Sequence, residues 1–128
     1  MQKRHHFPQN RLLYGELAAR AYTAWLRHLG VGYVVLTDGR PDYSARAEAA
    51  LVRTGRSGLR PVWGDGRVTI YAVPRPTPLV TGPHPARVVH LGDTTMKLAL
   101  GGAGSYRVAV RYSPYWTAKH ACVSEGKD

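Results

Sequence analysis

Hydrophobic and polar positions in the first half of the chain change their period several times. A first set of apolar positions recurs every four residues, as on one face of a helix: Leu13, Leu17, Ala21, Trp25 and Leu29. This spacing predicts a helix over residues 11–29. Asn10 is the expected N-cap and Gly30 the expected C-cap.

The run Val31–Leu36 is almost continuously apolar, which predicts a strand covered on both faces. A second helix is predicted from Ser44, as its cap, to about Thr54. Its expected inward residues are Ala47, Ala50 and Leu51.

Two further strands, Leu59–Trp63 and Arg67–Val73, are separated by Gly64-Asp65-Gly66, which is typical of a hairpin turn. Residues 11–73 are therefore expected to form a small α/β lobe with the order α-β-α-β-β, preceded by a basic lead-in at 1–10.

The prolines of the segment 74–85 cannot lie in a central strand, and they predict a linker. After it the period becomes two, with strands expected at three places: Arg87–Leu91, Thr95–Leu100 and Tyr106–Tyr112. Such alternation indicates an antiparallel, sandwich-like β lobe over 86–128. This lobe looks cut short, because no final strand follows. The predicted fold class is α+β.

Charge is the strongest feature of the composition. The 128 residues include 18 Lys+Arg and 8 Asp+Glu, giving a formal net charge of +10. That charge favours phosphate-bearing partners, so a basic nucleic-acid-binding module is one alternative for the function. The arginines occur singly along almost the whole chain, however, and nucleic-acid binding usually requires a clustered basic face. Nucleic acid is therefore the less favoured partner.

Several classes of protein and site are disfavoured by what the sequence lacks. No apolar run approaches the roughly 18 to 20 residues that cross a bilayer, so the chain as it stands is expected to be soluble. A single cysteine, Cys122, excludes an internal disulfide and a multi-cysteine zinc site. His5 and His6 are adjacent, and His120 with Cys122 gives two ligands where zinc needs three or four. No metal and no cofactor is predicted.

Candidate catalytic groups are equally sparse. Two Asp-Gly-Arg tripeptides, at 38–40 and 65–67, are interpreted as turns, and Gly101–Gly104 as a hairpin loop rather than a phosphate cradle. The nucleophile candidates are Cys122 with His120, or Ser113 with a distant histidine. Cys122 is interpreted as a small buried strand residue. A small soluble enzyme remains a second alternative, but no catalytic residue is predicted.

An aromatic segment gives the best binding candidates: Arg111, Tyr112, Tyr115 and Trp116. Aromatic rings beside a cationic side chain can stack on a sugar ring or lie at a membrane interface. In the other interpretation, Trp116 folds back and closes the open end of the sheet.

Several segments resemble those of a known group of proteins. They are Tyr22-x-x-Trp25-Leu26 followed by Gly30–Leu36, Asp42–Ala49, Leu59–Trp63, Ile70–Val73, and Tyr112–Trp116 with Ala121–Val123. Together they resemble actinobacterial multi-pass membrane proteins described as membrane glycosyltransferases of the lipid-linked-sugar type, or as uncharacterised membrane proteins. The resemblance covers about residues 10 to 125.

This resemblance implies that the chain is similar to the extracytoplasmic C-terminal region that follows a transmembrane bundle. The catalytic acidic residues of such enzymes lie in loops of the membrane part, and none has a matching position here. The resemblance therefore implies a non-catalytic accessory domain at the extracytoplasmic face of the cell membrane. Its expected partners are the transmembrane bundle of the same or a partner protein, and a glycan or an anionic lipid headgroup.

Overall fold

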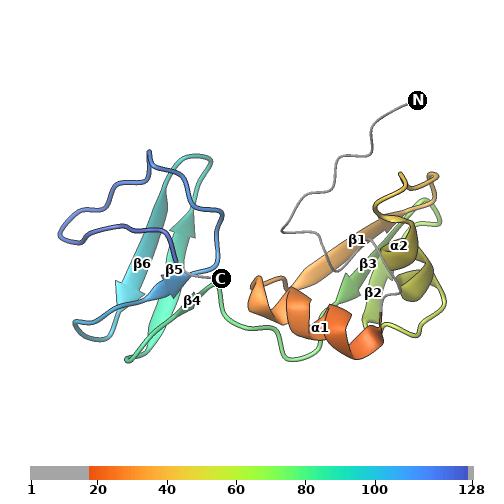
Figure 1. The fold of residues 1–128 in the computed structure, drawn as a ribbon, viewed down its shortest axis with the longest axis horizontal. Coiled ribbons are helices and arrows are strands. Elements are labelled where there is room, and N and C mark those ends of the chain that lie inside the picture. Colours follow the sequence, from red (N-terminus) through yellow and green to blue (C-terminus); the bar gives the residue numbers. More distant parts are fainter. Residues whose placement is uncertain (1–17, 127–128) are drawn as a thin grey trace. The chain divides into compact units, whose positions relative to one another are not determined.

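The computed structural model describes residues 18–126, which divide into two compact units between Thr77 and Pro78. The first unit contains two helices and three strands (Figure 1). In chain order they are α1 (Ala19–His28), β1 (Tyr33–Thr37), α2 (Arg46–Arg53), β2 (Arg60–Gly64) and β3 (Val68–Ala72). The predicted order α-β-α-β-β is confirmed.

The three strands of the first unit form one antiparallel sheet in the order β1-β3-β2. The turn between β2 and β3 is held by Asp65, whose Oδ1 accepts the backbone N–H groups of Arg67 (2.9 Å) and Val68 (2.8 Å). Gly66 has a φ of 90°, a backbone conformation that residues with a side chain rarely adopt. The Asp-Gly pair thus makes the predicted hairpin.

Helix α1 begins later than predicted, at Ala19, and its N-cap Ala18 makes no side-chain capping bond. The predicted cap Asn10 and residues 11–17 lie outside the described residues. At the other end, Gly30 N–H donates to Arg27 O (3.0 Å) and Val31 N–H to Leu26 O (2.9 Å). With a φ of 70° at Gly30, this is a Schellman motif. The predicted role of Gly30 at the end of the helix is confirmed, one residue beyond the cap itself.

The core of the first unit lies between the helices and one face of the sheet. Its buried members are Tyr22, Leu26, Val52, Leu59 and Val73. Helix α2 begins at Arg46, and Ser44 is not its cap, because the N-cap is Ala45.

The inward face of α2 was predicted only in part: Leu51 packs against the core as expected, but Ala50 does not. Ala49 and Val52 are buried, while Ala50 is exposed and Ala47 and Leu51 are half-buried. Short alanines on every side of α2 gave the sequence pattern little to separate the two faces.

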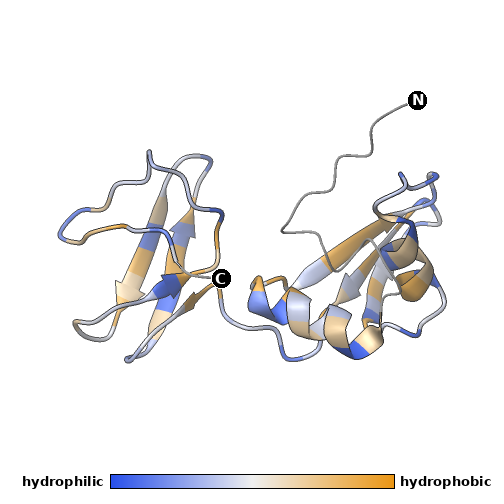
Figure 2. Cartoon of the chain, in the orientation of Figure 1, coloured by the Kyte–Doolittle hydropathy of each residue, from blue (hydrophilic) through white to orange (hydrophobic). Residues whose placement is uncertain are grey.

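The prediction that the first strand is covered on both faces is also wrong. β1 is an edge strand, and its side chains alternate in exposure. Val34 and Leu36 pack against the core, whereas Tyr33 is 67% and Val35 60% exposed. Figure 2 shows β1 in the orange of hydrophobic residues along much of its length, although one of its faces is open.

The second unit contains two small antiparallel sheets. β4 (Val80–Thr81) pairs with β7 (Arg107–Val108), and β5 (Ala86–Leu91) pairs with β6 (Met96–Leu100). The α+β class is confirmed. β4 lies within the segment that was predicted to be linker, because two residues are enough to pair there without conflict with the neighbouring prolines.

The strand predicted at Tyr106–Tyr112 is mostly absent, since β7 has only two residues. Ala109 N–H still donates to Leu79 O (2.8 Å), but Val110 N–H donates back to Val108 O (2.9 Å). A bond between residues i and i+2 is a γ-turn, which ends the ladder. Regular alternation in sequence therefore continues past the point where pairing stops.

Packing in the described part of the second unit is sparse: within residues 78–126, Val80 is the one fully buried hydrophobic residue. The ring of Tyr106 lies directly over the Cα of Gly82, where a Cβ would collide with it. The Tyr106 hydroxyl donates to Gly102 O (2.7 Å). This aromatic ring on a glycine ties the loop after β6 to the end of β4.

Candidate functional site

The binding candidates named from the sequence lie in the irregular chain that follows β7. Residues 111–116, called here the aromatic turn, contain a β-turn at Pro114-Tyr115. Trp116 N–H donates to Ser113 O (3.0 Å) and closes this turn. Serine at the first position and proline at the second are the residues that such a turn favours, because proline presets φ.

The turn also receives support from side chains. The Ser113 hydroxyl accepts the backbone N–H of Tyr115 (3.3 Å), and the indole Nε1–H of Trp116 donates to Arg111 O (3.2 Å). The indole therefore folds back onto its own segment, and Trp116 remains 37% exposed. Arg111 and Trp116 are the two candidates that the structure brings together.

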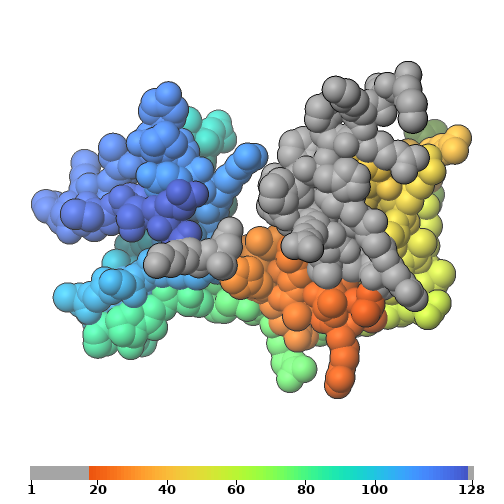
Figure 3. Space-filling view, viewed as in Figure 1, coloured from red at the N-terminus to blue at the C-terminus, as the bar shows by residue number. Residues whose placement is uncertain are grey.

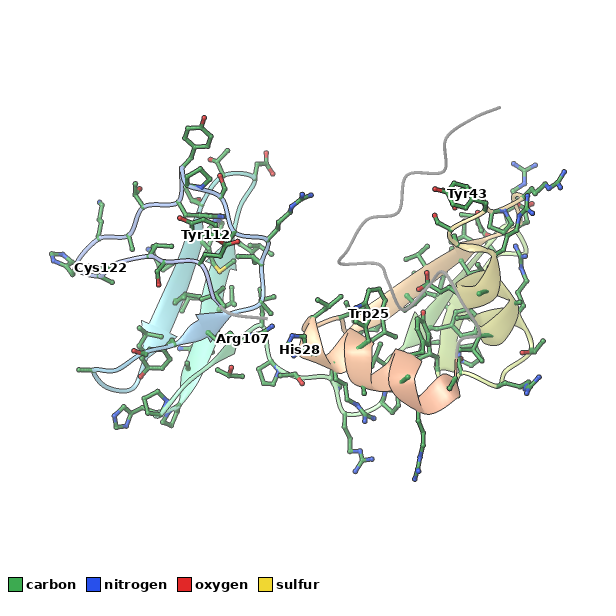
Figure 4. All side chains as sticks on the ribbon, viewed as in Figure 1. Trp25, His28, Tyr43, Arg107, Tyr112 and Cys122 are labelled. Carbon is green, nitrogen blue, oxygen red and sulfur yellow. The ribbon has the colours of Figure 1, made fainter. Side chains whose placement is uncertain are left out.

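The two tyrosines of the aromatic turn are more open than Trp116. Tyr115 at the tip is 90% exposed and Tyr112 is 40% exposed. Neither hydroxyl makes a hydrogen bond to another described residue. Tyr112 and the exposed Cys122 both belong to the chain after β7 (Figure 4). A flat ring on a proline-fixed turn is a surface that can stack on another flat or puckered ring.

Cys122 does not occupy the position predicted for it. It is exposed and lies in irregular chain, so it is not a buried strand residue. His120 has a φ of 61°, and the strand geometry that would place it on the same face as Cys122 is absent. The prediction failed because Ala121-Cys122-Val123 has strand-like composition but finds no pairing partner within the described residues.

The two Asp-Gly-Arg tripeptides have different surroundings. Asp65 holds the β2–β3 hairpin, and the backbone N–H groups of Val68 and Arg67 keep the pKa of its carboxyl below the usual range. Asp38 lies after β1, where its backbone N–H donates to Arg67 O (2.8 Å). Both tripeptides thus lie at the same end of the sheet.

No group of three His, Cys, Asp or Glu side chains within residues 18–126 could hold a metal ion. His5 and His6 lie outside the described residues. Neither helix of this part of the chain is long and apolar enough to span a bilayer.

Sequence reasoning missed one buried polar contact. Tyr22 is fully buried, and its hydroxyl donates to Glu48 Oε1 at 2.6 Å, which joins α1 to α2. Burial, reinforced by this bond to a carboxylate, raises the pKa of Tyr22 far above its ordinary value. The available signal was the single acidic residue in a helix otherwise made of apolar residues and arginine.

In comparisons with known proteins, no family model, no curated protein and no solved structure matches this chain.

Proposed function

We propose that this chain is a non-catalytic accessory domain of a membrane glycosyltransferase, acting at the extracytoplasmic face of the membrane. In this role the aromatic turn contacts the glycan or the lipid-linked acceptor. Support comes from the sequence resemblance and from the exposure of the aromatic turn. The observation that carries the proposal is Tyr115, which is 90% exposed at the tip of a hydrogen-bonded turn.

An exposed tyrosine on a fixed turn loses little conformational entropy when it binds a ligand, because its side chain has two rotatable bonds and its backbone is already held. The hydroxyl can donate to a sugar oxygen while the ring packs against the sugar C–H groups. Arg111, the first residue of the aromatic turn, is exposed and can face an anionic group such as a lipid-linked phosphate.

The proposal assigns no chemistry to this chain. Cys122 and His120 lie in exposed irregular chain, and neither forms a hydrogen bond to an acid or base within residues 18–126. The purified chain should therefore not turn over a sugar nucleotide or a polyprenyl-phosphate sugar. Robust turnover that a point mutation abolishes would contradict the proposal.

Binding is tested with soluble furanose and pyranose oligosaccharides and with vesicles that carry a polyprenyl phosphate. Tyr115→Ala should remove binding to whichever of these the chain recognises. Tyr33→Ala is the matched control, because Tyr33 is also an exposed tyrosine but belongs to the first unit. Equal loss in both variants would show that the aromatic turn is not the site.

A further inference from the structure

The first unit has a second surface feature that the proposed function does not use. It is an open hollow of about 520 Å³, lined by Arg40, Pro41, Arg46, Ala50, Arg53 and Thr54. None of these six residues is acidic. We propose that this arginine hollow binds a phosphate group, carried by a small molecule or by a lipid headgroup.

Helix α2 places two of the arginines. Arg46, Ala50 and Arg53 are separated by four and three residues and so share one face of the helix. Ala49 and Val52 take the other face into the core. The short side chain of Ala50 leaves open the space between its two arginine neighbours.

Arg53 is already held in position. Its Nη2 donates to Thr37 O (3.1 Å) at the end of β1 and to Gly39 O (3.3 Å) in the turn that follows. A guanidinium has five N–H donors, and these two bonds use those of one nitrogen. Nε and Nη1 of Arg53 make no hydrogen bond to the rest of residues 18–126. A fixed guanidinium with open donors loses little freedom when it binds.

Asp42 and Glu48, two carboxylates close to the hollow in sequence, are engaged by other donors. A third, Asp38, is exposed two residues before Arg40, and its side chain accepts no hydrogen bond from residues 18–126. Asp42 Oδ1 accepts the Ser44 hydroxyl (2.7 Å) and the backbone N–H groups of Ser44 (3.0 Å) and Ala45 (2.9 Å). These bonds lower the pKa of Asp42, to which the charge of Arg46 adds a smaller effect. Glu48 accepts the hydroxyl of Tyr22.

Three arginines line the hollow and two exposed carboxylates, Asp38 and Asp42, lie close to it in sequence, which leaves an excess of positive charge. Within the described part of the chain, none of its three arginines forms an ion pair. A concave surface lined by charges of one sign attracts counter-ions, and arginine forks match the spacing of phosphate oxygens. Because the hollow is wide open, a bound phosphate stays partly in water, which suits pyrophosphate or a lipid phosphodiester better than an apolar ligand.

Titration of the full-length chain with inorganic pyrophosphate at low ionic strength tests the site. Binding is followed by NMR on the arginine side-chain Nε–H signals. We expect saturable shifts of the signals from Arg40, Arg46 and Arg53. Arg40→Gln or Arg46→Gln should weaken binding about tenfold, the usual worth of one charge-assisted hydrogen bond. Arg87→Gln removes the same charge from an exposed strand residue of the second unit and should change affinity by less than about twofold.

A variant with the opposite sign makes the test sharper. Asp42→Asn keeps the side-chain oxygen that accepts from Ser44 and Ala45 but removes the negative charge beside Arg46. It should tighten pyrophosphate binding a few-fold, because one competing charge is gone. All variants are first compared by circular dichroism, which should show unchanged secondary structure.

A second arm separates the two sources of phosphate. If the ligand is a headgroup, vesicles that contain the anionic phosphodiester phosphatidylglycerol should bind the chain, and pyrophosphate should displace it from them. If such vesicles do not bind but pyrophosphate does, the ligand is a small molecule. Absence of saturable pyrophosphate shifts would overturn the proposal. The proposal would also be overturned if Arg87→Gln weakened pyrophosphate binding as much as the hollow variants do. Duplex DNA that binds through the same arginines and that pyrophosphate cannot displace would overturn it as well. The proposed function survives each of these failures, because it depends on the aromatic turn of the other unit.

Discussion

The contact between Tyr22 and Glu48 should be the most sensitive polar interaction of the first unit. The hydroxyl is buried, and it meets a carboxylate oxygen at 2.6 Å, the length of a charge-assisted bond. Tyr22→Phe removes the donor and leaves the ring in place. Because it isolates one hydrogen bond, its effect can be estimated from the structure.

Hydrogen bonds to charged groups contribute about 1.5–3 kcal/mol. Glu48 is half-buried, so water can replace part of the lost bond, and the lower end of that range applies. We expect Tyr22→Phe to destabilise the first unit by about 1.5 kcal/mol, or to lower its melting temperature by roughly 6–12 °C for a domain of this size.

The assay is urea unfolding followed by circular dichroism at neutral pH. Tyr33→Phe is the control, since Tyr33 is exposed and its change should fall within about 0.5 kcal/mol. Equal stability of Tyr22→Phe and the wild type would refute the reasoning that this bond joins the two helices.

The remaining predictions concern pH and backbone geometry. Because the folded-state pKa of Tyr22 is raised, its contribution to the free energy of unfolding is complete below about pH 10 and falls as the pH rises further. The stability of the wild type, measured by urea unfolding at each pH, should therefore drop more steeply above about pH 10 than that of Tyr22→Phe. Gly55→Ala should lower the free energy of unfolding by about 1 kcal/mol, because Gly55 has a φ of 71°, whereas Gly32→Ala should be nearly neutral. An added Cβ meets nothing within 4 Å at either position, so equal melting temperatures of the two variants would exclude backbone strain at Gly55. Gly82→Ala should destabilise the second unit by about 1–3 kcal/mol by displacing the ring of Tyr106, but should cost little when added to Tyr106→Ala, as measured by hydrogen exchange of that unit. The same cost in both backgrounds would count against the clash.

Local patterns in the sequence predicted much of the first unit. The helical period around Trp25, the turn residues at Asp65-Gly66 and the position of Gly30 each depend on neighbours within a few residues. Because these features depend only on residues close in sequence, they could be predicted from it.

Features that depend on distant segments could not be predicted. The apolar run Val31–Leu36 does not reveal that only one face of β1 meets the helices. Alternation at Tyr106–Tyr112 does not reveal the γ-turn at Val108–Val110, because the pairing with β4 stops at Leu79, just before β4 begins. Both errors arose because the sequence of a strand does not indicate which distant segments of the chain pack against it.

The two candidate sites differ in how visible they were. Tyr115 was named from the sequence as a binding candidate, and Pro114 before it favours the turn that exposes it. The arginine hollow was missed because its residues look scattered, although Arg46 and Arg53 are seven apart and hence on one helix face. The contribution of Arg40 depends on how the turn after β1 approaches α2, which sequence does not give.

A side chain from the red-orange region of α1 projects away from the rest of the first unit (Figure 3). Exposed arginine is common in the described residues, for example Arg20, Arg56 and Arg60, so charge alone cannot distinguish a site from the background. Duplex DNA provides the measure of that background: weak binding that falls steeply with salt and does not depend on any single arginine is the expected result.

The central claim is that the aromatic turn recognises a carbohydrate or a lipid-linked carbohydrate. The most direct measurement follows the indole N–H signal of Trp116, assigned with a Trp116→Phe variant among the three tryptophans. This N–H donates to Arg111 O and reports on the turn without a label. We predict a saturable shift of this signal with one oligosaccharide class or with polyprenyl phosphate, retained in Tyr33→Ala and lost in Tyr115→Ala. No shift with any of these ligands, or a shift that Tyr115→Ala leaves unchanged, would contradict the account.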